Sequence, residues 1–145
     1  MKYIMIVLFI GLLGVTAYQD RRNQKISNRW IVALSMVNLL SLFFDPEISL
    51  WNRLVGMGIV SIPLLIVSIA VPGAFGGGDI KLMAVAGFFL CMRRIAFSFV
   101  IGVVLAAVYS IILLIGGKAD RHTKIAMGPF FTAGIIAALC LYPLN

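Results

Sequence analysis

Two of the five acidic residues, Asp20 and Asp79, stand where a long apolar segment meets a polar loop. Asp20 follows the apolar stretch Tyr3–Tyr18, and Asp79 comes directly before Ile80–Met92. Two neighbouring carboxylates can share a single proton, because both do not easily ionise side by side. The ionised member then takes a proton from water while the protonated member polarises a carbonyl group. Such a pair favours the hydrolysis of a peptide bond by activated water.

The composition indicates the solvent in which this pair would work. Hydrophobic residues make up 62% of the 145 residues, and charged residues only 12%. Soluble domains are about 45–50% apolar and about 25% charged. A chain of this length has no soluble fold that could bury so much apolar surface, so we expect an integral membrane protein.

Polar interruptions divide the chain into about six expected transmembrane helices, which would form one all-α polytopic domain over residues 1–145. The expected spans are Tyr3–Tyr18, about Ile26 or Trp30 to Phe44, about Leu54 to Val71, Ile80–Met92, Ile95–Ile115 and Ile125–Leu144. The fourth span is short for a bilayer crossing, which takes ~20 residues. Either Arg93 and Arg94 reach outward from a short span, or the preceding glycine loop lies partly inside the membrane. A single helix over 80–115 would bury both arginines in lipid at roughly 2.5–3.5 kcal/mol each, so we set it aside.

Counting crossings places the two aspartates on the same side of the membrane. The chain crosses twice between Asp20 and Asp79, whichever way the protein is oriented. Loops on this side hold eight basic residues, against four on the other side, which predicts a cytoplasmic active face and both termini outside. The net charge of +7 is thus a topology signal and does not indicate nucleic-acid binding. The four residues counted outside are Lys2, Arg53, Arg93 and Arg94.

The other acidic residues need no special function. Asp45 and Glu47 flank Pro46 in an expected outer turn, and Asp120 lies in a basic loop together with His122, the only histidine.

An alternative interpretation of the first 17 residues is a cleavable secretory signal, since a lysine and an apolar core precede a V-T-A ending. The interpretation as a first span is favoured because a second span follows and Asp20 then has a use.

Three consecutive glycines precede Asp79. Gly76, Gly77 and Gly78 would allow positive φ angles and a close approach to a substrate strand. The alternative is an ordinary loop that ends in an aspartate as a helix N-cap. Lys81 would either stabilise an ionised Asp79 or extend to the interface, and the second is favoured.

Further positions carry secondary expectations. Asn28 would cap the second span or orient Asp20, and Gly11, Gly14 and Gly56 would allow close packing of helices. Gly128 and Pro129 would set the start of the last span. Helix dipoles suggest that Asp79, at a helix N-terminus, is the resting base and that Asp20, at a C-terminus, is the resting acid, although Arg21 and Arg22 oppose this assignment.

Three segments carry a resemblance to a known family. "DRRNQKISN" (20–28), "GGGDIKLM" (76–83) and "KIAMGPFFTAG" (124–134) resemble, in order and spacing, the motifs of the prepilin peptidases, which are polytopic G-x-G-D aspartyl proteases. The resemblance implies that Asp20 and Asp79 are catalytic and that Gly76–Gly78 and Lys81 form the active-site loop, without metal or cofactor. It also implies a bacterial inner-membrane enzyme that removes the basic leader of type IV prepilins or pseudopilins, cutting after a glycine at the cytoplasmic face.

The two cysteines, Cys91 and Cys140, lack the paired C-x-x-C spacing that the larger, bifunctional members of that family carry. The chain is thus similar to the minimal peptidases of Flp/Tad-type pilus systems, and we expect no methyltransferase activity and no zinc site. Two other classes stay open. A small transporter or channel subunit would use Asp20 and Asp79 as an ion or proton site, and a silent assembly subunit would tolerate their loss.

Overall fold

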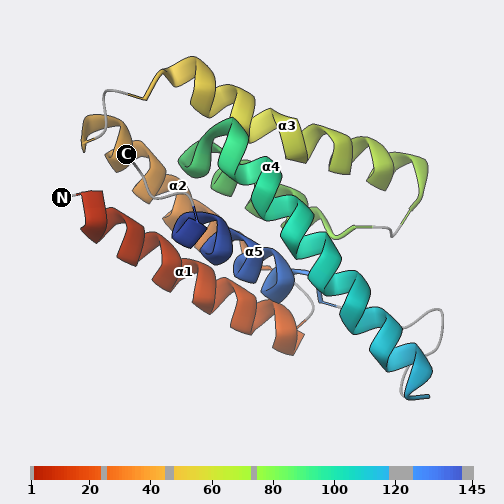
Figure 1. Cartoon of the computed structure of the whole chain (residues 1–145). Coiled ribbons are helices and arrows are strands. Elements are labelled where there is room, and N and C mark those ends of the chain that lie inside the picture. The colour runs from red at the N-terminus through yellow and green to blue at the C-terminus, as the bar shows by residue number, and fades with distance from the viewer. Residues whose placement is uncertain (1, 24–25, 45–47, 73–74, 118–125, 142–145) are drawn as a thin grey trace.

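A computed structural model describes the chain except for residues 1, 24–25, 45–47, 73–74, 118–125 and 142–145 (Figure 1). The described part consists of five helices. These are α1 (Lys2–Asn23), α2 (Asn28–Phe44), α3 (Leu50–Ala70), α4 (Gly77–Ile115) and α5 (Gly128–Leu141). The all-α prediction is confirmed. The expectations for Asp45, Glu47, Asp120 and His122 concern residues outside this description.

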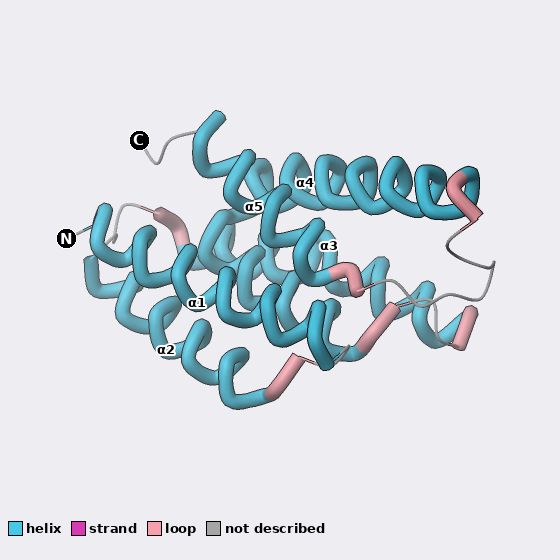
Figure 2. The backbone as a smooth tube through the Cα atoms, turned by 90° about the horizontal axis from the view of Figure 1, so that it is seen from below, coloured by secondary structure: helices cyan, strands magenta, loops and turns pink. Residues whose placement is uncertain are grey.

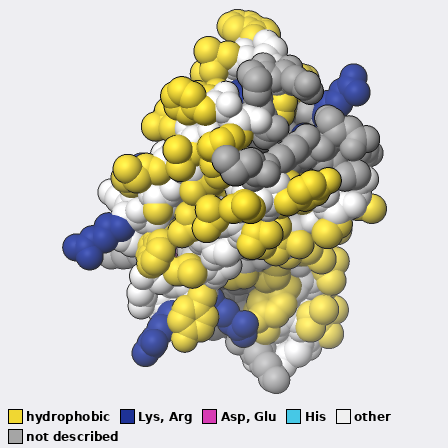
Figure 3. Space-filling model, turned by 90° about the vertical axis from the view of Figure 1, so that its left-hand side faces the viewer, with side chains coloured by type: hydrophobic (Ala, Val, Ile, Leu, Met, Phe, Trp, Pro, Cys, Tyr) yellow, Lys and Arg dark blue, Asp and Glu magenta, His cyan; other side chains and the backbone are white. Residues whose placement is uncertain are grey.

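The surface and the helix lengths fit a protein embedded in lipid. Helices α1, α3 and α4 are long and apolar enough to cross a membrane, and α2 and α5 are shorter apolar helices. Large apolar side chains point outward along the bundle, with Tyr3, Phe43 and Ile115 each at least 80% exposed. Figure 3 shows hydrophobic side chains spread over one face of the molecule. Contact of such a surface with lipid costs no free energy, whereas its contact with water is unfavourable.

Helix α4 changes direction at Cys91. A straight helix over its 39 residues would measure about 58 Å, roughly twice the thickness of the hydrocarbon core. Cys91 has φ 64° and ψ 175°, a conformation that non-glycine residues rarely adopt. The second half of α4 runs antiparallel to α5, since Ser98 lies against Gly134 and Gly102 lies against Phe131. The green and cyan parts of α4 in Figure 1 follow these two directions.

This break corresponds to the expected boundary between the fourth and fifth spans. It falls two residues before the expected position at Arg93 and Arg94. Helix α3 crosses α4 here, and a Cβ atom added to Gly56 would lie 2.8 Å from the Cα of Cys91 and would overlap the carbonyl oxygen of Gly87. The close packing expected at Gly56 is therefore confirmed.

The same expectation is wrong for two glycines of α1. Gly11 and Gly14 are exposed, and a Cβ atom at either would meet nothing within 4 Å. They lie on the outer surface of α1, away from the packed face. Spacing alone did not reveal which side of α1 faces the bundle.

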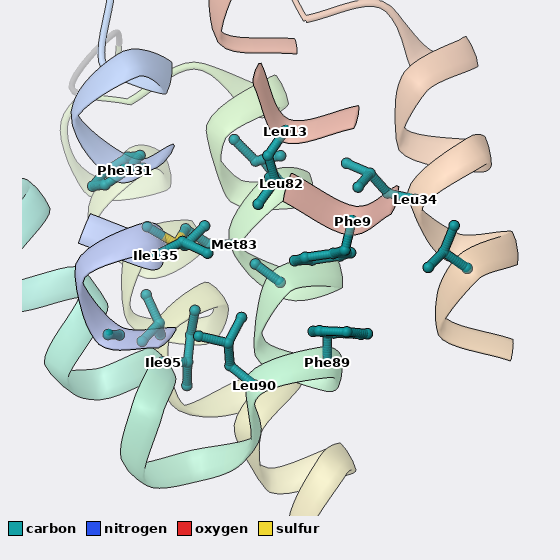
Figure 4. Packing of buried hydrophobic residues seen from close by; sticks show 14 of the residues in the cluster. Phe9, Leu13, Leu34, Leu82, Met83, Phe89, Leu90, Ile95, Phe131 and Ile135 are labelled. Atoms are coloured by element: carbon teal, nitrogen blue, oxygen red, sulfur yellow. The ribbon is translucent and has the colours of Figure 1, made fainter. Parts of the chain in front are cut away.

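The core joins α1 to α2, α4 and α5 (Figure 4). The rings of Phe9 and Phe89 stack with their centroids 4.1 Å apart, and Leu13, Leu34 and Leu82 are fully buried near them. Helix α1 contacts both α2 and α5, as Figures 1 and 2 show from two directions. The N-terminal segment is thus an integral part of the described bundle.

Arg53 is buried, although its place in the sequence predicts a charge in an outer loop. It lies in α3 at 1% exposure, donates a hydrogen bond from Nη1 to Ser41 Oγ at 2.9 Å, and faces the Phe88 ring at 5.8 Å. Without it, three of the four outer basic residues remain against eight on the other side. The direction of the charge bias is therefore unchanged.

Candidate active site

Asp20 and Asp79 come together from two helices. Asp20 lies near the C-terminal end of α1, which continues to Asn23, and Asp79 lies in the first turn of α4. Both are buried, at 5% and 8% exposure, and they lie close enough for their charges to interact. The two aspartates thus lie at the same end of the bundle, which agrees with the placement that counting crossings predicted.

Helix α5 holds Asp20 in place. The backbone N–H of Gly128, the first residue of α5, donates a hydrogen bond to Asp20 Oδ2 at 2.9 Å. A Cβ atom at position 128 would lie 2.6 Å from that oxygen, so only glycine leaves room for the carboxylate. The expected helix start at Gly128 is confirmed. The contact with Asp20 was missed, although counting crossings places the start of the last span on the side of both aspartates.

This contact removes the basis for assigning the shared proton from helix dipoles. Asp20 belongs to the C-terminal end of α1, but it also faces the N-terminal end of α5. Asp79 lies at the N-terminal end of α4. Because each carboxylate meets the positive end of a helix dipole, the dipoles no longer distinguish a resting acid from a resting base.

The glycines before Asp79 are needed for space and not for unusual backbone angles. Gly76 is the N-cap of α4 with φ −71° and ψ 140°, and Gly77 and Gly78 already belong to the helix. The expectation of positive φ at these glycines is wrong for this structure, in which Gly117 is the glycine with positive φ among the described residues. The alternative, an ordinary loop that ends in Asp79 as the N-cap, is also wrong in this detail, because the N-cap is Gly76.

The three glycines differ in the space that surrounds them. A Cβ atom at Gly76 would lie 3.2 Å from Asp79 Oδ2, and one at Gly78 would lie 2.9 Å from the Cβ of Ile26. A Cβ atom at Gly77 would meet nothing within 4 Å. Gly78 therefore lets the segment after α1 pack against the start of α4, whereas Gly77 presents an open face beside the aspartates.

Lys81 connects two helices at the edge of the site. Its side chain is exposed, and Nζ donates a hydrogen bond to Asn28 Oδ1 at 3.2 Å. Asn28 is the first residue of α2, so the contact joins the start of α2 to the first turns of α4. Lys81 thus supports the loop geometry through Asn28.

One oxygen of the aspartate pair is left without a partner. Asp79 Oδ1 is buried and accepts no hydrogen bond from the described residues. A buried polar atom without a hydrogen bond costs free energy, so a native structure that keeps one calls for an explanation. At an aspartate pair, an oxygen of this kind can take the shared proton or a water molecule.

The fold and the site define a helical membrane protein with a buried aspartate pair at the ends of its helices. Residues 7–111 match the type IV leader peptidase family. The chain therefore belongs to this family of aspartic-type peptidases. The match includes Asp20 and Asp79, whereas the G-P-F segment lies beyond it.

Curated relatives agree with this assignment. The chain is 30% identical over 132 residues to a prepilin leader peptidase/N-methyltransferase of Bacillus subtilis (strain 168), covering 91% of this chain and 53% of that protein. It is 28% identical over 141 residues to a protein of the same name from Stutzerimonas stutzeri, covering 93% and 48%. The chain thus spans about half the length of these relatives. No solved structure matches it significantly.

Proposed function

We propose that this chain is a membrane aspartyl endopeptidase that removes the leader peptide from type IV, Flp-like prepilins and pseudopilins. The cut falls after a glycine, at the cytoplasmic face of a bacterial inner membrane. The observation that carries the proposal is the burial of Asp20 and Asp79 side by side, with Asp20 held by the Gly128 N–H. The excess of basic residues in the loops on this side supports the orientation.

The pair would act as one unit that carries a single proton. The ionised carboxylate takes a proton from water as the water oxygen attacks the scissile carbonyl carbon. The protonated carboxylate gives its proton to the carbonyl oxygen, so a neutral tetrahedral intermediate forms. Its collapse breaks the C–N bond, a proton passes to the leaving nitrogen, and the pair again holds one proton. Neither a metal nor a cofactor takes part in this sequence.

The substrate would approach through the bilayer. The apolar helix of a prepilin can lie in lipid beside the bundle and bring its leader junction to the depth of the aspartates. Gly77 leaves an open face next to Asp79, where an extended substrate backbone would fit. A small residue at the cleavage site suits such a narrow approach.

The test is cleavage of a co-expressed Flp-like prepilin, followed by gel shift and by N-terminal sequencing of the product. We expect a cut directly after the leader glycine, and we expect a bulky residue in place of that glycine to block it. Normal processing of the bulky variant would reject the narrow slot. If two different prepilins stayed intact while the chain was present in the membrane, the peptidase proposal would fail.

Two glycines, one packed and one on the outer surface, provide a matched pair of variants. We expect Gly78→Ala to lower the cleavage rate about tenfold or more, because the new methyl group meets Ile26 at 2.9 Å and displaces the start of α4. Gly11→Ala adds the same methyl group in open space on the outer surface of α1 and should stay within about twofold of the wild-type rate on a prepilin with its natural glycine. Initial cleavage rates at equal enzyme levels in membranes measure both. Equal losses at the two positions would contradict the packing assigned to Gly78.

A further inference from the structure

Thr132 lies in α5 one helical turn after Gly128, the residue that contacts Asp20, and its hydroxyl group is buried. Thr132 is 5% exposed, and its Oγ1 has no hydrogen-bond partner among the described residues. A hydroxyl in an apolar interior is expensive to leave unpaired. In native structures such groups usually bind water or serve the function of the site.

The helical register directs Thr132 toward α1. It follows Gly128 by four residues, which places both on the same face of α5. Gly128 meets Asp20 on this face, whereas Phe131 and Gly134 lie against Gly102 and Ser98 of α4. Because side chains in a helix tilt toward its N-terminus, the Thr132 hydroxyl points back toward the level of Asp20.

A second threonine on α1 makes a useful contrast. Thr16 precedes Asp20 by four residues, is fully buried, and donates its hydroxyl proton to the carbonyl oxygen of Leu13 at 2.7 Å. Its hydrogen is therefore used within its own helix. The Thr132 hydroxyl has no such use, so it can serve the aspartate pair as a donor.

We propose that Thr132 is a positioning residue for leader cleavage, and this rests on the proposed peptidase function. Its hydroxyl binds a water molecule next to the two aspartates and acts on Asp20 through this water. The water is needed because no direct hydrogen bond joins Thr132 to Asp20. A buried water needs two to four polar partners. The Thr132 hydroxyl, the Asp20 carboxylate and the unpartnered Asp79 Oδ1 are groups of the required kind. The water would hold the two carboxylates in their reactive orientation.

The experiment compares Thr132→Val and Thr132→Ser in purified enzyme with a prepilin substrate. Valine has nearly the shape of threonine without the hydroxyl, so we expect kcat to fall about tenfold while KM stays unchanged. Serine keeps the hydroxyl and should restore kcat to within about threefold of wild type. Ser98→Ala is the matched control, because Ser98 Oγ is also buried without a partner but lies on the α4 side of the helix pair. Its kcat should stay within about twofold of wild type.

Thermal unfolding separates this role from packing. Thr132→Val should unfold close to the wild-type temperature, because valine keeps the packing of threonine and loses only the hydrogen bond to one water molecule. The proposal is overturned if Thr132→Val keeps the wild-type kcat, if serine fails to restore kcat, or if the loss appears in KM. A marked fall in unfolding temperature would overturn it as well. A wild-type enzyme without cleavage would reject the proposed function itself, which is a separate result.

Discussion

Asp20→Asn and Asp79→Asn are each expected to abolish leader cleavage, with a fall of at least about 10³-fold in the single-turnover rate. Proton transfer by a positioned side chain contributes roughly 10²–10⁴-fold to a rate. Asparagine can neither take a proton from water nor give one to the carbonyl oxygen, so a pair with one asparagine lacks one of the two proton transfers. Because the two residues act as one unit, the double variant should be no slower than either single variant.

The fold should survive these changes, which makes the loss interpretable. Asparagine has the size of aspartate, and its amide oxygen can still accept the hydrogen bond that Gly128 now donates to Asp20 Oδ2. Membrane levels and unfolding temperatures should therefore match the wild type. Asp120→Asn changes an acidic residue that the sequence places in a loop and should keep the full rate. A single variant that retained more than a tenth of wild-type activity would remove that carboxylate from the proposed pair.

Gly128→Ala is expected to lower kcat by about 100-fold. Its Cβ atom would lie 2.6 Å from Asp20 Oδ2 and 3.0 Å from the Asp20 Cβ, so either the carboxylate or the start of α5 must move. A displacement of about 1 Å at a reacting group can cost about 10²-fold in rate. The loss should appear mainly in kcat, because the proposed substrate helix would bind along the lipid-facing surface, away from Gly128. Initial rates over a range of prepilin concentrations measure this division.

Gly14→Ala is the matched control for this variant. It makes the same substitution on the exposed face of α1, where the new methyl group meets nothing within 4 Å, and activity should remain within about twofold. Equal unfolding temperatures for the two variants would locate the effect of Gly128→Ala at the site. Near wild-type activity in Gly128→Ala would mean that the α5 contact does not position Asp20.

Much of the fold follows from the alternation of apolar runs with polar interruptions. The second expected span, about Ile26 or Trp30 to Phe44, corresponds to Asn28–Phe44, because lipid selects helices by hydropathy and length. The break in α4 was expected at Arg93 and Arg94 and lies at Cys91. The unusual backbone of Cys91 occurs where α3 packs closely through Gly56, a tertiary contact with no local signal.

The sequence also predicts part of the site, namely the position of the two aspartates. The two aspartates were found because counting crossings requires no side-chain geometry. The contact of Gly128 with Asp20 depends on how α5 is rotated against α1, and the even hydrophobicity around α5 gives no indication of this rotation. The two aspartates of the proposed pair could therefore be found from the sequence, whereas the contact of Gly128 with Asp20 could not.

The hydrogen bond between Asp20 and Gly128 joins residues 108 positions apart, from the first and the last described helices. A nascent chain that has inserted only its first four helices already contains both aspartates, but it lacks the segment that holds one of them. The proposed proteolytic competence would therefore arise only once α5 has docked against α1.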